Sequence, residues 1–270
     1  MEIRVLGPLT ACENGVSIVP SAAKPRQILA LLALNSGRVV TVPALMEELW
    51  GAALPRSAAT TLQTYILQLR RRLCAALEPS AGSAKDVLVT RHGGYLLDAA
   101  PGSIDAQEFD RLTAEGYAAY DMDAPEAAAR LLTRALALWT GPALVDVQQG
   151  RLLEVEVMRL QESRLAALER RIDADLQLAR HHEVLGELAG LTAQYPMHEN
   201  LHAQFMLALY RCGRPSRALE AYRRLRTALV DELGLEPSAR LRRLQQSVLA
   251  ADPSLDDIRP ARLADTRLAV

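Results

Sequence analysis

The stretch SAATTLQTYILQLRRRLCAAL, residues 57–77, contains no glycine or proline and predicts a long helix that covers Thr60 to Leu77. Its first residue, Ser57, is a suitable N-cap. Apolar side chains recur at helical spacing and form one face of this helix: Leu62, Ile66, Leu69 and Leu73. At about 100° of rotation per residue, the opposite face carries Thr60, Thr64 and Arg71, flanked by Thr61, Gln68 and Arg72. Hydroxyl, amide and guanidinium groups on one face can hydrogen-bond to base edges and phosphates in a DNA major groove.

Two shorter helices are predicted before the long one. The first begins near Ala23, with Pro25 in its first turn, and Gly37 is its stop signal. The second is capped by Thr41 and ends before Gly51. Upstream of both, apolar and polar residues alternate on either side of a turn, which predicts a small N-terminal sheet that contains Ile3, Val5, Val16 and Ile18.

A β-hairpin is predicted after the long helix. Residues 87–90 and 95–97 are apolar or β-branched, and between them lies Arg91-His92-Gly93-Gly94. The glycine pair supplies the positive φ that a tight hairpin needs. Arg91 at the tip is suited to a narrow minor groove, where the negative potential attracts arginine. His92 beside it is a second candidate for contact with DNA.

The order of these elements is more specific than any one of them. A polar helix face is usually only solvated, and a hairpin is usually only a hairpin. A sheet, three helices and a hairpin in this order, with the basic residues on the third helix, predict a winged helix-turn-helix domain over residues 1–99. Lys24 and Arg26, at the start of the first helix, are expected to contact flanking phosphates.

Composition and charge agree with a two-domain globular protein. The chain has 270 residues, of which 50% are hydrophobic, 23% charged and only 4% aromatic, a bias that favours helices over a β-sandwich or β-barrel. The formal net charge of −1 conceals an asymmetry between the halves of the chain. Residues 1–98 carry ten lysines and arginines against seven acidic residues, whereas the remainder is net acidic.

The second half predicts helices only. Helical segments are expected at 109–120, 125–139, 152–179, 201–210 and 215–229. Residues 182–189 resemble residues 215–222, an offset of 33 that is close to the ~34-residue tetratricopeptide period. Residues 105–251 are therefore predicted to form an all-α, tetratricopeptide-like domain with a concave protein-binding surface. A frayed tail is expected over residues 252–270. The fold class expected for the whole chain is mainly α, with an α+β winged helix at the N-terminus.

The sequence also resembles a known family. The segments that carry the resemblance are residues 2–9, 24–27, 62–66, 70–73 and 90–95 in the first half, and 206–214, 218–222 and 231–237 in the second. Residues 1–99 look like an OmpR-type winged-helix domain, and residues 1–251 resemble the Streptomyces antibiotic regulatory proteins, which add a bacterial transcriptional activation domain. Gln68 departs from the family, in which a smaller polar residue is expected.

The resemblance implies a function and partners. It implies an activator of a secondary-metabolite gene cluster that binds tandem direct repeats in promoter DNA as a dimer and contacts RNA polymerase. Larger relatives carry an ATPase module, and this sequence has no P-loop motif. No catalytic, cofactor-binding or metal-ligating residue is assigned.

One motif suggests an enzyme instead. His198-Glu199-Asn200-Leu201-His202 matches H-E-x-x-H, the zinc-peptidase pattern, in which two histidines hold Zn²⁺ and the glutamate acts as base. Pro196 lies just upstream, so His198 is expected at a helix terminus with poor ligand geometry. Five residues with three fixed also occur often by chance. A zinc peptidase is therefore kept only as a remote alternative.

The sequence contains no pattern typical of a membrane or secreted protein. No apolar run approaches the ~20 residues of a membrane span, Met1–Val5 does not look like the start of a signal peptide, and three scattered cysteines indicate no disulfide framework. These features predict a cytoplasmic, nucleoid-associated protein that needs no membrane. The main hypothesis is a DNA-binding transcriptional activator. A protein-interaction scaffold whose winged helix has lost DNA binding is the alternative.

Overall fold

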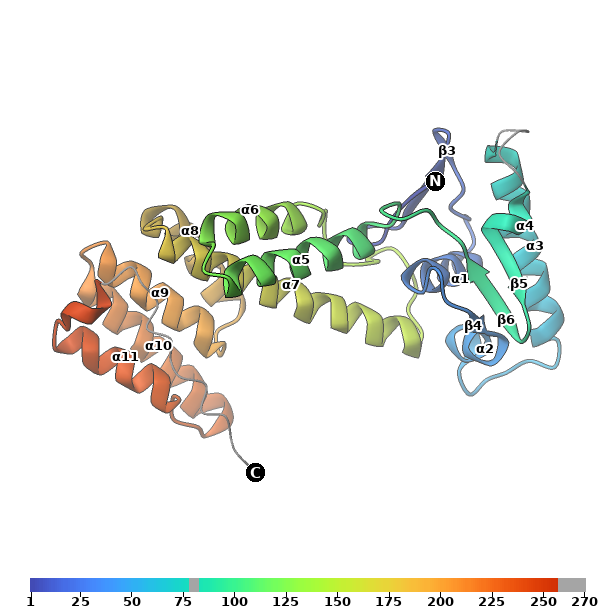
Figure 1. Ribbon diagram of the computed structural model, residues 1–270. Coiled ribbons are helices and arrows are strands. Elements are labelled where there is room, and N and C mark those ends of the chain that lie inside the picture. Colours follow the sequence, from blue (N-terminus) through green and yellow to red (C-terminus); the bar gives the residue numbers. More distant parts are fainter. Residues whose placement is uncertain (78–82, 257–270) are drawn as a thin grey trace, which may run out of the picture. The chain divides into compact units, whose positions relative to one another are not determined.

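The computed structural model describes residues 1–77 and 83–256, and Figure 1 labels most of their helices and strands. The first part of the chain contains β1 (Glu2–Arg4), β2 (Thr10–Glu13), β3 (Val16–Ser17), α1 (Ala23–Leu34), β4 (Val40–Thr41), α2 (Val42–Trp50), α3 (Ala58–Ala76), α4 (Ala84–Val87), β5 (Leu88–Arg91) and β6 (Gly94–Leu97). The remainder contains α5 (Asp105–Asp121), α6 (Pro125–Leu136), α7 (Arg151–Gln177), α8 (His181–Gln194), α9 (Glu199–Arg211), α10 (Pro215–Leu233), α11 (Ala239–Leu249) and a 3₁₀ turn, η1 (Pro253–Leu255).

The chain divides into two compact units. The first comprises Met1–Ala114 and Arg134–Ala166, and the second comprises Glu115–Thr133 with the described residues from Ala167 onward. The division passes through α5, α6 and α7, so each of these helices contributes residues to both units. The fold is the predicted one in class: a winged helix with small sheets, followed by helices only. Within the described residues, no helix is long and apolar enough to cross a membrane.

The first unit begins with the predicted N-terminal sheet. Strands β1, β2 and β3 form an antiparallel sheet in that order, with Ile3 opposite Ala11. The three helices α1, α2 and α3 pack against one another. Thr41 caps α2 as expected, since its hydroxyl accepts the N–H of Ala44 at 3.3 Å. Ser57 occupies the N-cap position of α3, but its side chain makes no capping hydrogen bond.

The hairpin belongs to a larger sheet than the sequence predicts. Strands β5 and β6 pair antiparallel, and β4 adds to the far side of β6 with Val40 opposite Tyr95. Strand β4 has only two residues, too few to show a period-2 pattern. Val87, expected in a strand, is instead the last residue of α4. A Cβ at Gly94 would lie 2.2 Å from the carbonyl oxygen of Val40, so β4 can approach β6 only because this residue is glycine.

A buried carboxylate joins α2 to the start of α7. Glu48 is only 3% exposed. Its Oε1 accepts the N–H of Gly150 at 2.7 Å, and its Oε2 accepts the N–H groups of Leu152 and Leu153 at 2.8 and 3.1 Å. The side-chain amide of Gln27 on α1 also donates to Oε1, at 2.8 Å. Glu48 therefore satisfies the first N–H groups of α7, as a local N-cap side chain would.

Two aspartates attach the N-terminal segment of the first unit. Asp105, at the start of α5, accepts the N–H groups of Val5 and Leu6 at 2.9 and 3.0 Å. Burial raises the pKa of this carboxyl group despite its backbone donors. Asp146 accepts the N–H of Leu9 at 2.7 Å and also pairs with Arg26. Residues more than 90 positions apart are thus held together by directed hydrogen bonds.

The second unit is built from helical hairpins with the expected repeat. Helix α9 packs against both α8 and α10. The α7–α8 and α9–α10 turns each contain a residue with positive φ, Ala179 (φ 59°) and Gly213 (φ 71°). These positions, like the starts of α8 and α10, are 34 residues apart rather than the 33 of the sequence match. The buried core includes Leu188, Phe205 and Leu225.

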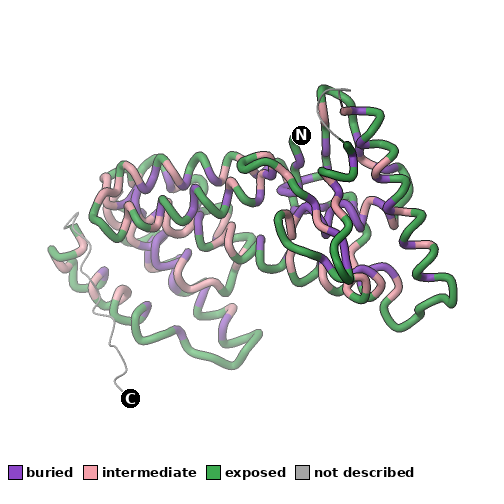
Figure 2. Tube along the Cα trace, turned by 45° about the vertical axis from the view of Figure 1, so that its right-hand side comes forward, coloured by how far each residue is buried: buried purple, intermediate pink, exposed green. Residues whose placement is uncertain are grey.

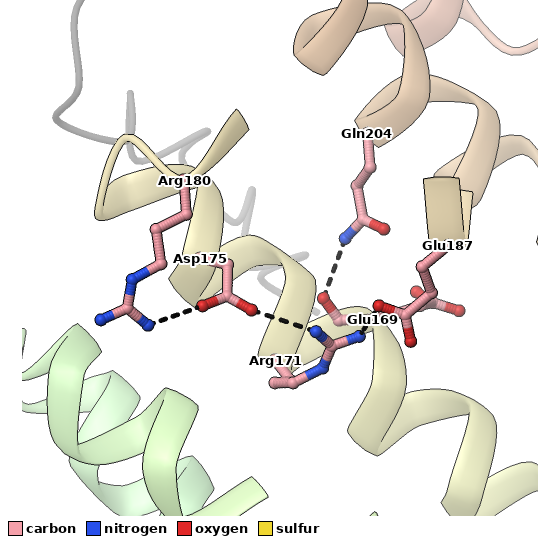
Figure 3. A network of polar contacts seen from close by, with 6 residues as sticks. All are labelled: Glu169, Arg171, Asp175, Arg180, Glu187 and Gln204. Atoms are coloured by element: carbon pink, nitrogen blue, oxygen red, sulfur yellow. Dashed lines mark hydrogen bonds and ion pairs between the residues drawn. The ribbon is translucent and has the colours of Figure 1, made fainter. Parts of the chain in front are cut away.

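A network of charged side chains lies on the first helices of this repeat (Figure 3). Arg171 donates to Asp175, four residues later on α7, at 3.1 Å and also to Glu187 on α8. Arg180, in the α7–α8 turn, donates to the other oxygen of Asp175 at 3.0 Å. The network therefore fixes α7, the turn and α8 to one another.

Some helix ends differ from the expected ones. Helix α6 ends at Leu136 rather than Trp139, and α11 was not expected. Most of the predicted tail, residues 257–270, lies outside the described part of the chain. The described residues after Asp252 form the turn η1 instead of frayed chain, and the carbonyl of Leu255 accepts a hydrogen bond from Arg211 Nε at 2.7 Å.

Candidate nucleic-acid interface

Helix α3 has the two faces that its sequence predicts. The apolar face is buried, with its four leucine and isoleucine side chains only 1–3% exposed. On the opposite face Thr60, Thr64, Gln68, Arg71 and Arg72 are exposed and Thr61 is half-buried. Figure 2 shows this alternation of buried and exposed residues along the helices. The hydroxyl of Thr64 donates to the carbonyl of Thr60 at 3.0 Å, so its oxygen can still accept a hydrogen bond.

The hairpin presents the predicted tip. Arg91 is paired with Gly94, and the two residues between them, His92 and Gly93, form the turn. Only Gly93 has a positive φ, at 77°, whereas Gly94 is required by the approach of β4. Arg91 and His92 are both exposed, so the tip offers a guanidinium and an imidazole group to solvent.

Arg70 connects α3 to the hairpin, a role that the sequence did not reveal. Its Nε and Nη2 donate to the carbonyl oxygen of Leu88 at 3.0 and 2.7 Å, and Nη2 also donates to Thr90 Oγ1 at 2.8 Å. The neighbours Arg71 and Arg72 point to the exposed side instead. Arg70 thus sets the position of β5 relative to the exposed face of α3. The sequence of three consecutive arginines does not reveal that Arg70 contacts the hairpin while the next two are exposed, because this depends on where the hairpin lies in the fold.

We expect Arg70→Ala to loosen the hairpin. The variant loses hydrogen bonds from a charged donor to a carbonyl and a hydroxyl, which corresponds to about 1–2 kcal/mol in the free energy of unfolding. Hydrogen exchange should show faster exchange of the β5 and β6 amides. Arg71→Ala, one residue away on the exposed side, is the matched control and should leave this exchange unchanged. Equal exchange in both variants would contradict the role given to Arg70.

Lys24 and Arg26 have partners within the chain. The ammonium group of Lys24 lies 4.6 Å from the ring centroid of Trp50, a cation–π contact. Arg26 forms an ion pair with Asp146. Their contact with phosphate stays a prediction, and it would require Arg26 to leave Asp146.

A shallow groove of about 360 Å³ borders the exposed face of α3. It is lined by Gln68, Arg71 and Arg72 and by the residues that lead into α1, which are Pro20, Ser21 and Ala22. Helix α1 begins here, and the first N–H groups of a helix favour anions. The groove therefore joins two guanidinium groups to a helix N-terminus, a combination suited to a phosphate group.

Two further residues share the exposed face of α3: Gln63 and Leu67. Leu67 follows Thr64 by three residues and Thr60 by seven. Residues at this spacing lie on one side of a helix, so Leu67 lies on the same face as the two threonines. From the sequence, only polar residues are expected on this face, so Leu67 is an unexpected member of it.

The H-E-x-x-H motif has structural partners in the second unit. His198 is the N-cap of α9; its Nδ1 accepts the N–H of Leu201 at 3.4 Å, and its Nε2 lies 3.0 Å from Glu169. Glu199 accepts the N–H of Ser238 at 2.9 Å. His202 is 4% exposed, and burial lowers its pKa. Across residues 1–77 and 83–256, no three His, Cys, Asp or Glu side chains are arranged to hold a metal ion. The motif therefore gives the zinc-peptidase alternative no support.

Comparisons with known protein families match both halves of the chain. Residues 18–97 match the family described as "Transcriptional regulatory protein, C terminal". Residues 104–249 match the family described as "Bacterial transcriptional activator domain". The first match contains α3 and the hairpin, and the second spans α5 to α11.

Similar proteins extend the match over nearly the whole chain. "Regulatory protein DnrI" of Streptomyces peucetius is 56% identical over 257 residues, which cover 95% of this chain and 94% of that protein. "Transcriptional regulator RedD" of Streptomyces coelicolor is 38% identical, over 94% of this chain and 72% of that protein. Among solved structures, "Mycobacterium tuberculosis EmbR in complex with low affinity phosphopeptide" superimposes with a TM-score of 0.87 at 32% identity. It covers 94% of this chain and 68% of that one.

Proposed function

Because the chain belongs to the Streptomyces antibiotic regulatory protein family, a family of transcriptional regulators, we propose that it activates a secondary-metabolite gene cluster by binding specific promoter DNA. The observation that carries this proposal is the exposed face of α3. It displays threonines, a glutamine and two arginines beside a hairpin with an arginine at its tip. This face lies within the segment that matches transcriptional regulatory proteins.

The side chains divide into two kinds of contact with DNA. Helix α3 enters the major groove, with Thr60, Thr61, Thr64 and Gln68 near base edges. Arg71 and Arg72 bind phosphates, which fix the position of the helix on the duplex without selecting sequence. Arg91 and His92 at the hairpin tip enter the adjacent minor groove. Phosphate contacts release counterions, so the affinity falls as salt concentration rises.

Two substitutions on α3 test this division. Arg71→Ala should weaken binding about tenfold on every duplex and should reduce the slope of log K against log salt by about 1, since one phosphate contact is lost. Thr64→Ala should instead reduce the preference for one or two base pairs while binding to unrelated DNA stays unchanged. Gel shifts on duplexes selected from a random pool, and on scrambled ones, measure both effects.

Matched variants separate chemistry from folding. Thr64→Ser keeps the hydroxyl group and is the control for Thr64→Ala. Glu154→Ala changes an exposed charge on α7 and is the control for Arg71→Ala. If Arg71→Ala and Thr64→Ala both bind like the parent protein, α3 does not lie in the groove. Salt-insensitive binding to a protein, with no binding to promoter DNA, would support the scaffold alternative.

The helical part is proposed as the activating half. We assign DNA binding to residues 1–99 and interaction with RNA polymerase to residues 105–251, because helical repeats present extended protein-binding surfaces. Binding of tandem direct repeats requires at least two copies, so we propose a homodimer on DNA. The protein acts without enzymatic activity of its own, in the cytoplasm at the nucleoid, where promoter DNA lies.

A further inference from the structure

Leu67 is an apolar side chain on the polar face of α3. It is 49% exposed, whereas the four apolar side chains of the opposite face are 1–3% exposed. Leu67 is therefore not part of the packing that holds α3 to α1 and α2. Single exposed apolar side chains are common on protein surfaces, and what distinguishes Leu67 is its place within the face of α3 that is proposed to bind DNA.

The surroundings of Leu67 determine what can cover it. Its neighbours at helical spacing are Gln63, Thr64, Arg70 and Arg71, all of them polar or charged, and all but the half-buried Arg70 are exposed. Helix α3 contains no acidic residue and carries three consecutive arginines, residues 70–72. A single apolar group among hydroxyl, amide and guanidinium groups does not match the continuous apolar core of a protein interface. This arrangement instead fits a ligand with many negative charges and a few separate apolar groups.

DNA presents such a group in the major groove. Among the base-pair edges there, the 5-methyl group of thymine is the apolar feature, and leucine-sized side chains can contact it. We propose that Leu67 contacts the 5-methyl group of a thymine and so selects an A·T pair at one position of each bound site. This inference rests on the proposed function, because it places α3 in a major groove.

The experiment compares thymine with uracil, which lacks only the methyl group. The full-length protein first enriches duplexes from a random pool. An enriched duplex is then prepared with thymine or with deoxyuridine throughout, and fluorescence anisotropy gives the two dissociation constants. The parent should bind the thymine duplex about fourfold more tightly per contacted methyl, the ratio expected for burying one methyl group. Single deoxyuridine replacements then locate the thymine.

Variants show whether Leu67 is the cause of the preference. At the located position, Leu67→Ala should bind the thymine duplex and the singly substituted deoxyuridine duplex equally, with its loss of affinity confined to the thymine duplex. Gln63→Ala, an exposed neighbour one turn earlier on the same helix, should retain the parent's ratio. Because an effect of uracil on DNA shape would persist in Leu67→Ala, this variant separates contact from shape.

Three outcomes would overturn the inference. One is equal affinity of the parent for both duplexes, and another is a preserved ratio in Leu67→Ala. The third is loss of self-association in Leu67→Ala, measured by sedimentation, with the ratio intact, since Leu67 would then be covered by a second copy of the chain. Failure of the proposed function itself is distinct, because then no duplex is enriched at the first step.

Discussion

Glu48→Ala is expected to lower the free energy of unfolding of the first unit by about 3–5 kcal/mol, since several buried donors lose a shared acceptor at once. The substitution leaves three backbone N–H groups of the α7 start without their acceptor, while the amide of Gln27 keeps the main-chain carbonyl of residue 48 as its one remaining acceptor. Each buried donor left unsatisfied costs about 1–3 kcal/mol, reduced where water can enter. The effect should therefore be among the largest of any single substitution in this chain.

Urea unfolding followed by tryptophan fluorescence measures this effect. Both tryptophans of the protein, Trp50 and Trp139, lie in the first unit and report on it. Glu47→Ala is the matched control, since Glu47 pairs with Arg151 at the surface at 3.1 Å and such pairs contribute about 0–1 kcal/mol. Glu48→Gln keeps one acceptor oxygen and should be intermediate. A Glu48→Ala protein as stable as Glu47→Ala would show that water replaces the carboxylate without cost.

Gly94→Ala is expected to separate β4 from β6. The added Cβ would lie 2.2 Å from the carbonyl oxygen of Val40 and 2.9 Å from its carbonyl carbon, and backbone atoms cannot rotate away as a side chain can. Overpacking of this kind costs about 1–3 kcal/mol, and we expect the upper end here. The hairpin should also lose its fixed position, so the variant should bind its selected duplex at least tenfold more weakly.

Hydrogen exchange and gel shifts on the same preparation measure both consequences. The amides of β4 and β6 should lose protection while those of α9 and α10 keep it. Gly190→Ala is the control, because nothing lies within 4 Å of a Cβ at that position of α8 and alanine favours a helix over glycine. Parent-like protection of β4 in Gly94→Ala would mean that the sheet accommodates the methyl group by a small shift.

Local sequence patterns predicted the helices and the hairpin of the interface, but they did not predict contacts between residues that are distant in the sequence. Helical spacing separated the two faces of α3, and Thr41 and Gly93 marked a cap and a turn. These features depend on residues within a few positions of one another. The partners of Glu48 on α7 and the partner of Arg26, Asp146, lie more than 100 positions away, so no local pattern contains them.

One signal of the Glu48 contact was nevertheless present. Leu45, Glu48 and Leu49 share one face of α2 by their spacing, and all three are buried. A carboxylate between two core leucines requires donors from elsewhere in the fold. The sequence could have shown that Glu48 needs a partner, although not that the partner is the start of α7. Leu67 is the reverse case, an apolar residue on a polar face. Its helical spacing places it among the exposed threonines, but its apolar side chain favours assignment to the core.

The carboxylate of Glu48 also limits how such regulators can be recombined. A chimera that joins the winged helix of one relative to the activating helices of another would exchange Glu48 without Gly150, whose missing side chain makes room for it. A donor sequence with any larger residue at that position would clash with the backbone of α2. Functional chimeras should therefore keep Glu48 and Gly150 together, and among natural relatives the residues at these two positions should vary together.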